Sequence, residues 1–171
     1  APPMGAGVVI INHTVTLDMD YSHSSGSITI NSSGSLIDNS AMRVFALNYP
    51  TGTATLTVNG SFNVSRVPLS SGIVTNQGTF QSDSLLNSAT LTNNSGATIN
   101  ALQFMNNTLG IINNSGTIIS TNFFNIASVT NSNSMTSNDF TNSKSFTNTN
   151  TGNMTITHDF ANMDTLASPA V

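Results

Sequence analysis

Apolar and polar residues alternate in short segments along most of the chain. Examples are Val15-Thr16-Leu17, Ile28-Thr29-Ile30, Leu56-Thr57-Val58, Thr90-Leu91-Thr92 and Met154-Thr155-Ile156. Because successive side chains of a strand point to opposite faces, this alternation predicts short β-strands with one apolar face. Ser, Thr, Asn and Gly dominate, and strong helix formers never accumulate at helical spacing, so helix is disfavoured along nearly the whole length.

A short Asn-x-Gly turn recurs between these segments. Its glycines are 18, 20 and 36 residues apart, and Ser132-Asn133-Ser134 stands where a further turn is expected. Gly suits a corner with positive φ, and Asn tolerates the left-handed region. Stacked Asn amides can both donate and accept hydrogen bonds, which predicts a ladder. The predicted corner ladder consists of Asn76, Asn94, Asn114 and Asn150, with Gly78, Gly96, Gly116 and Gly152.

A second repeated element follows each turn, in which apolar residues lead to an Asn. This element predicts a second ladder, formed by Asn87, Asn106, Asn125, Asn142 and Asn162. Apolar side chains at equivalent positions are expected to stack as a continuous core. The predicted core stack consists of Phe62, Phe80, Leu86, Phe104, Ile118, Phe124, Phe140, Met154 and Phe160.

Two elements that share one period of 18–20 residues are typical of a solenoid. The sequence therefore predicts an all-β, single-stranded, right-handed parallel β-helix of about eight coils, in one domain covering 1–171. Residues 8–25 are expected to form a first coil or cap, and residues 163–171 an irregular tail. Gly34 and Gly60 are 26 residues apart, more than the 18–20 residues of one coil, so residues 41–51 are expected to protrude as an insertion.

The composition excludes several classes of protein. Asn, Ser and Thr supply 74 of 171 residues, whereas only 6% of residues are charged and the net charge is −4. Three basic residues cannot neutralise a phosphate backbone, so we expect no nucleic-acid partner. The longest apolar run, Val8 to Ile11, is far shorter than the roughly 20 residues of a spanning helix, so the chain is not expected to span a membrane.

Candidate catalytic and metal-binding residues are sparse. The seven Asp residues are scattered singly, although Asp139 and Asp159 are one coil apart and could stack as a weak cation site. The segment from Asp18 to Asp20 resembles the start of a calcium loop, but His23 stands where that loop needs Gly. No nucleophile motif is present. We therefore expect no enzyme activity, no metal and no cofactor.

Threonine pairs raise the possibility of an ice-binding surface. Thr53-Ala54-Thr55, Thr90-Leu91-Thr92 and Thr155-Ile156-Thr157 have the Thr-x-Thr form that would place two hydroxyls on one face of a strand. They do not recur once per coil at a fixed distance from the Gly corner. The sequence therefore predicts no flat array of Thr, and strand propensity explains the pairs.

The repeats Ser27–Leu36 and Gly110–Ile119 resemble the Asn/Ser/Thr/Gly-rich solenoid regions of secreted bacterial surface proteins, including filamentous adhesins and exported proteins of Bacteroidota. This resemblance covers about residues 8–162, and it lacks the Asn-Pro-Asn-Leu secretion signature of two-partner-secreted adhesins. It implies export and display on the bacterial cell surface. The start Ala1-Pro2-Pro3 agrees with a mature N-terminus after signal cleavage.

These observations lead to a functional expectation. We expect a non-enzymatic extracellular β-solenoid with a structural or adhesive role, which could be the subunit of a self-assembling surface fibre. The expected partners are like subunits, other surface proteins and glycans. The alternative is a polysaccharide-binding or polysaccharide-processing β-helix, because carbohydrate-cleaving enzymes often use this fold.

Overall fold

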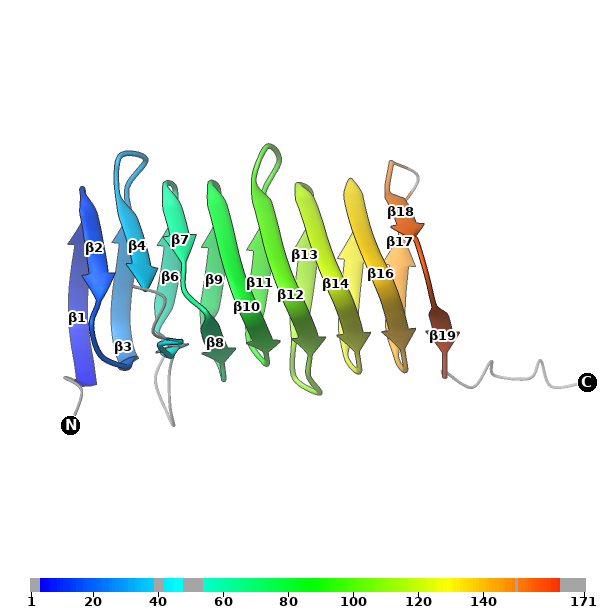
Figure 1. Cartoon of the computed structure of the whole chain (residues 1–171), viewed down its shortest axis with the longest axis horizontal. Coiled ribbons are helices and arrows are strands. Elements are labelled where there is room, and N and C mark those ends of the chain that lie inside the picture. Colours follow the sequence, from blue (N-terminus) through cyan, green and yellow to red (C-terminus); the bar gives the residue numbers. More distant parts are fainter. Residues whose placement is uncertain (1–3, 39–41, 48–53, 150, 164–171) are drawn as a thin grey trace, which may run out of the picture.

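The chain winds into a stack of parallel coils. A computed structural model describes residues 4–38, 42–47, 54–149 and 151–163, and these residues form 19 strands and no helix. Each strand between the first and last coils pairs in parallel with the equivalent strands one coil before and one coil after it. In Figure 1 the chain advances from left to right while the near strands run down and the fainter strands run up, so the coil is right-handed. The predicted parallel β-solenoid is confirmed.

Three walls enclose the core. Wall A contains β1 (Met4–Ile11), β3 (Tyr21–Ile30), β6 (Thr55–Val58), β9 (Ile73–Asn76), β11 (Thr90–Asn93), β13 (Ile111–Asn114), β15 (Ser128–Asn131) and β17 (Ser145–Asn148). It lies behind the other two walls in Figure 1. Eight strands in this wall correspond to the predicted number of coils.

Walls B and C are joined by long bent strands. Wall B contains β2 (Thr14–Leu17), β4 (Ser35–Asp38), β7 (Ser61–Asn63), the first parts of β10 (Thr79–Asn87), β12 (Thr98–Asn106), β14 (Thr117–Asn125) and β16 (Ser134–Asn142), and β18 (Asn153–Ile156). Wall C contains the first residues of β1 and β3, β5 (Phe45–Leu47), β8 (Arg66–Leu69), the second parts of β10, β12, β14 and β16, and β19 (Phe160–Asn162). The turn from wall A to wall B is the AB corner, and the turn from wall C to the next wall A strand is the CA corner.

Each wall contributes one main column of inward side chains. The wall A column is Val9, Ile28, Leu56, Val74, Leu91, Ile112, Val129 and Phe146. The wall B column is Val15, Leu36, Phe62, Phe80, Ile99, Ile118, Met135 and Met154. In wall C the buried aromatic rings lie one coil apart, and those of Phe104 and Phe123 are 4.8 Å apart between centroids. Burial of each such side chain stabilises the fold by about 1.5–3 kcal/mol.

The predicted core stack is right for most positions and wrong at two. Phe62, Phe80, Phe104, Ile118 and Phe140 are fully buried, and Met154 packs against the core.

Leu86 and Phe124 point outward and are only half-buried, whereas Leu85 and Phe123 fill the core. The following residues, Asn87 and Asn125, point inward, and adjacent residues of a strand cannot share a face. Phe160 keeps its register above Phe140, with ring centroids 5.9 Å apart, but it is 60% exposed because it lies on the last coil of the described residues.

The N-terminal coils are less regular than the later ones. Residues 8–25 do form a first coil, through β1, β2 and the start of β3. The insertion expected at 41–51 is wrong for residues 45–47, since β5 lies within wall C and both Phe45 and Leu47 are fully buried. The Asp38 carboxylate anchors the approach to β5 by accepting hydrogen bonds from the backbone N–H groups of Arg43 and Ser65. Residues 41 and 48–51 lie outside the described residues.

Candidate functional site

One Asn from each of the last five coils stacks at the AB corner. These residues are Asn76, Asn93, Asn114, Asn131 and Asn148, and all but the last are buried. Each Nδ2 donates to the Oδ1 of the next Asn, over 2.7–2.8 Å. The first four also donate to a wall B carbonyl of the next coil, over 2.9–3.0 Å. Both amide hydrogens of those four therefore have partners.

The predicted membership of this ladder needs one correction. Asn93, and not Asn94, pairs in register with Asn76 and Asn114. The AB corner of that coil is two residues longer than in the neighbouring coils, which leaves Asn94 in the turn. Asn150 lies outside the described residues, and Asn148 supplies the rung in its coil.

Three of the four predicted corner glycines lie directly before wall B, and the fourth lies within a longer turn. Gly78 directly precedes wall B, where an added Cβ would lie 2.1 Å from the Gly60 carbonyl oxygen, so only Gly fits. Gly116 and Gly152 occupy the same position in their coils, with similarly close backbone or side-chain neighbours. Gly96 belongs to the longer turn, with φ +81° and open space around it, and Ala97 stands directly before wall B instead.

The second predicted ladder is confirmed at every position. At the CA corner, Nδ2 of each Asn donates to Oδ1 of the next, over 2.7–3.0 Å, from Asn87 through Asn106, Asn125 and Asn142 to Asn162. Asn106 and Asn125 also donate to the carbonyls of Ser128 and Ser145. A buried amide with all its partners stabilises a single register, because a shift would leave polar groups unpaired.

A sequence signal for the first ladder was available in the strands of wall A. Four of these strands end in an apolar residue, Thr and Asn, namely Val74-Thr75-Asn76, Leu91-Thr92-Asn93, Val129-Thr130-Asn131 and Phe146-Thr147-Asn148. This triplet identifies Asn93 and Asn131, which the Asn-x-Gly turns do not, because the length of the turn varies between coils.

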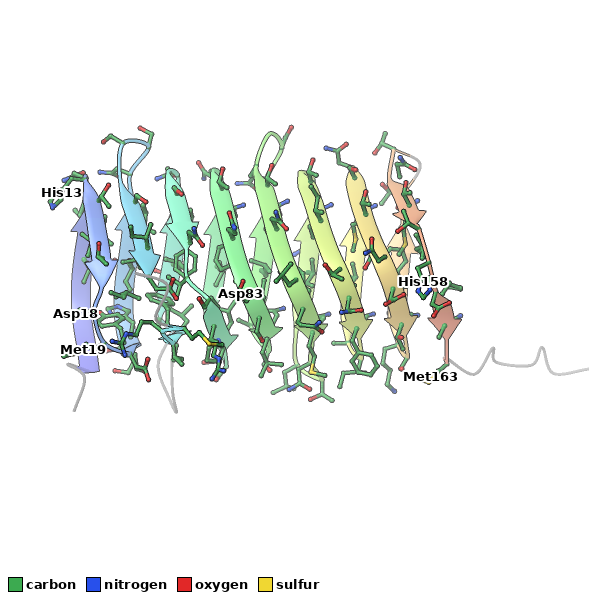
Figure 2. The ribbon with its side chains drawn as sticks, viewed as in Figure 1. His13, Asp18, Met19, Asp83, His158 and Met163 are labelled. Carbon is green, nitrogen blue, oxygen red and sulfur yellow. The ribbon has the colours of Figure 1, made fainter. Side chains whose placement is uncertain are left out.

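Three ligating side chains meet near the last coil, on walls B and C. Asp139, His158 and Asp159 each offer an atom within 4.8 Å of the others, and this group is the one such cluster found among the described residues. The hydrogen bond from His158 Nδ1 to Asp139 Oδ1, 2.6 Å long, raises the pKa of His158, and the charge of Asp159 raises it further. The same bond lowers the pKa of Asp139. His158 is labelled in Figure 2 beside the last strands.

The other candidate cation residues have a structural role. Asp18 and Asp20 are exposed, and Asp20 Oδ1 accepts the backbone N–H of Val44, which connects the first coil to the approach of β5. His23 is fully buried at the CA corner, with Nδ1 3.0 Å from the Tyr21 hydroxyl. Burial lowers the pKa of His23.

The expectation of no regular Thr array is wrong. In wall A, Thr29, Thr57, Thr75 and Thr92 follow one another in register on the outer face, one per coil. The distance to the Gly corner varies because the corners differ in length, so counting from that glycine concealed the row. Position along the wall A strand is what stays constant.

Wall C carries a different outer surface. Pro68, Leu86, Met105 and Phe124 form an apolar stripe along the axis, in register from coil to coil. Beside it lie Ser84, Gln103 and Asn122, which line a shallow depression of about 400 Å³ together with Leu86, Met105 and Phe124.

The first and last coils expose core side chains. Around the first coil, an apolar depression of about 310 Å³ is lined mainly by Val9, Val15, Leu17 and Tyr21. At the last coil Phe146, Met154 and Ile156 are only half-buried. Among the described residues, the outermost strands of both ends pair with a neighbouring strand on one side only.

Neither the fold nor the surface assigns the chain to a known group. Within the described ranges, no helix has the length and apolar character needed to cross a membrane. Comparison with protein-family models, with curated proteins and with solved structures gave no match.

Proposed function

We propose that this chain is a non-enzymatic structural or adhesive rod of the bacterial cell surface, able to join like subunits end to end. The observation that carries the proposal is the continuity of the inward columns and Asn ladders through successive coils. A rod of this kind resists bending because every coil is hydrogen-bonded to the next along three walls.

The two ends support association between like subunits. If β17 of one copy lay against β1 of another, Phe146 would follow Val9 in the inward column of wall A. In wall B, Met154 would meet Val15 and Ile156 would meet Leu17, so apolar side chains would again face apolar ones. Such pairing would cover exposed core at both ends and satisfy the unpaired strand edges.

Electron microscopy at increasing protein concentration tests this association. We expect rods that lengthen into filaments as concentration rises. Val15→Asp, at the open first coil, should reduce filament length, whereas Ile119→Asp, which changes a 41% exposed side chain on the outside of wall B, should not. Single rods at all concentrations would contradict the filament, as would equal effects of both substitutions.

Display on the cell surface is the second part of the proposal. It is supported by the likeness of the repeats to surface solenoids and by uncharged walls of amides and hydroxyls that suit an aqueous exterior. Labelling of intact source cells with an antibody to the rod should give a surface signal. A signal found only after lysis would contradict display and leave the filament test unaffected.

Carbohydrate binding is a second candidate, favoured by the outer face of wall C. The apolar stripe beside Ser84, Gln103 and Asn122 offers stacking surface and amide groups along one line, as an extended polysaccharide would require. Polysaccharides incubated with the full chain should be retained, and Phe124→Ala should reduce retention more than Ile119→Ala. Cleavage of a polysaccharide would contradict the non-enzymatic proposal, and lack of retention across the panel would contradict this candidate.

A further inference from the structure

The outer face of wall A is a two-row array with one pair of side chains per coil. The pairs are Val8 and Ile10, Ser27 and Thr29, Thr55 and Thr57, Ile73 and Thr75, Thr90 and Thr92, Ile111 and Asn113, Ser128 and Thr130, and Ser145 and Thr147. Hydroxyls occupy eleven of these sixteen positions, aliphatic groups four and an amide one. None of the sixteen side chains is charged.

The side chains of this array are rigid as well as regular. Twelve of the sixteen are Thr, Val or Ile, whose branched Cβ restricts χ1 to few rotamers. Strands of one wall lie about 4.8 Å apart, and residues i and i+2 of a strand lie about 6.6–6.8 Å apart. Methyl and hydroxyl groups are thus held on a two-dimensional lattice with two fixed repeats.

The aliphatic members of the array are unusually exposed. Val8 is 75% exposed, Ile10 59%, Ile73 51% and Ile111 43%. All four are β-branched, like the Thr residues beside them, so they preserve the shape of the array while replacing hydroxyls with methyl groups. Methyl groups are thus interspersed among the hydroxyls along the array, and they do not gather into one contiguous apolar patch.

The outer faces of the other walls are less uniform. In wall B the first outer row includes Thr79, Thr98 and Thr117, but the second row contains Asn63, Gln81 and Asn100, which have longer and more flexible side chains. Wall C carries Arg66 and Asp139 on its outer face. The turns between strands leave at the upper and lower edges of the rod in Figure 1, so the described turns do not cover wall A. Its surface is therefore neutral, flat and open.

We propose that wall A binds ice. Two fixed repeats on the protein surface can match the repeats of a crystal surface, whereas a flexible or charged ligand would not need such a match. Both spacings lie close to repeats of the oxygen lattice of hexagonal ice, so the hydroxyls can take lattice positions and the methyl groups can hold ordered water between them. The neutral ice surface also matches a wall without charges. This binding does not depend on filament formation or on display at a cell surface.

Ice partition and thermal hysteresis of the full chain test the proposal. We expect the fluorescently labelled chain to enter growing ice and to lower the freezing point below the melting point. Thr75→Tyr combined with Thr92→Tyr should reduce hysteresis roughly tenfold, because two bulky rings in neighbouring coils break the flat lattice.

The matched control is Thr79→Tyr combined with Thr98→Tyr, which changes wall B in the same two coils. This control should keep most of the hysteresis, which would support wall A as the binding face. Exclusion of the native chain from ice, or equal loss in both double variants, would overturn the proposal. Circular dichroism identifies a variant that fails to fold. In that case the entry of the native chain into ice, or its exclusion, decides whether the chain binds ice.

Discussion

The N-terminal and C-terminal coils fill the same corner positions with opposite chemistry. At the AB corner, Ile11, Ile30 and Val58 precede Asn76 in one inward column. At the CA corner, Leu47 and Leu69 precede Asn87. Both corners change from apolar to Asn at the same coil. The coils before Asn76 and Asn87 place aliphatic residues at these corners, except for His23, which lies at the CA corner in register with Leu47. A buried corner accepts Asn where the coil above or below also supplies one.

The two kinds of corner stabilise the rod in different ways. An aliphatic corner contributes about 1.5–3 kcal/mol by burial and tolerates small shifts. An Asn corner gains about 1 kcal/mol per hydrogen bond, but one unpaired partner costs about 1–3 kcal/mol. We infer that the C-terminal coils hold their register more strictly than the N-terminal coils.

The sharpest test moves an Asn into the apolar corner. Leu47→Asn places an amide in the fully buried corner next to Leu69, without an Asn neighbour, and should destabilise the protein by about 4–6 kcal/mol. Leu69→Asn lies next to Asn87 and extends the ladder by one rung, so it should lose only about 2–3 kcal/mol. Urea unfolding followed by circular dichroism gives both values. Equal losses would show that Asn neighbours do not matter.

The reverse exchange removes a rung from the ladder. Asn106→Leu deprives Asn87 Nδ2 of its acceptor and leaves the Ser128 carbonyl and Asn125 Oδ1 without their donor. We expect a loss of about 2–4 kcal/mol in the free energy of unfolding. Asn162→Leu, at the exposed end of the same ladder, is the control and should lose about 1 kcal/mol or less. A smaller effect at 106 than at 162 would contradict the cooperative ladder.

Substitutions at two corner glycines test separately how close contact and backbone conformation affect stability. Gly78→Ala pushes a Cβ to 2.1 Å from the Gly60 carbonyl oxygen, which forces the coils apart and should lose about 2–3 kcal/mol. Gly96→Ala meets no atom but must adopt φ +81°, at about 1 kcal/mol. Thermal unfolding monitored by calorimetry should place Gly78→Ala at the lower melting temperature. The opposite order would show that the longer turn limits stability.

Acidification should change the stability of the N-terminal and C-terminal halves in opposite directions. This change should be smaller than those caused by the substitutions above. Burial lowers the pKa of His23, so its contribution to stability is lost as pH falls below the ordinary value of 6.5. The hydrogen bond with Asp139 raises the pKa of His158, so that contribution is complete below 6.5 and is lost as pH rises through the raised pKa.

NMR titration of the two imidazole rings measures these shifts directly. His23→Leu should make the melting temperature less sensitive to acid, and His158→Gln should remove a small gain on acidification. Because the lowered pKa of Asp139 preserves its charge, the His158 pair should persist down to mildly acidic pH. A His158 that titrates below His23 would contradict both assignments.

Sequence analysis predicts one ladder better than the other for a geometric reason. The Asn residues of the CA corner end β10, β12, β14 and β16, which are all nine residues long, so each Asn lies at the same distance from the start of its strand. The AB corner contains three to five residues from Asn to the next strand, and counting from its glycines misplaces Asn94. The outer row that includes Thr75 is missed for the same reason.

Side-chain alternation explains the remaining errors. Leu86 and Phe124 precede inward Asn residues directly, so they face water although each belongs to an apolar pair. The burial of β5 could not be anticipated, because it depends on how the chain returns to wall C within the 26-residue interval between Gly34 and Gly60.

Both Asn ladders have a direction. In every rung the Asn of the earlier coil donates the hydrogen bond and the Asn of the later coil accepts it, so the amide dipoles add along the axis and polarise one another. The last donor of the AB ladder, on Asn148, bonds to the Gly152 carbonyl instead. The two ladders therefore give the rod an electrical polarity, with the amide donors of each coil directed toward the C-terminal end.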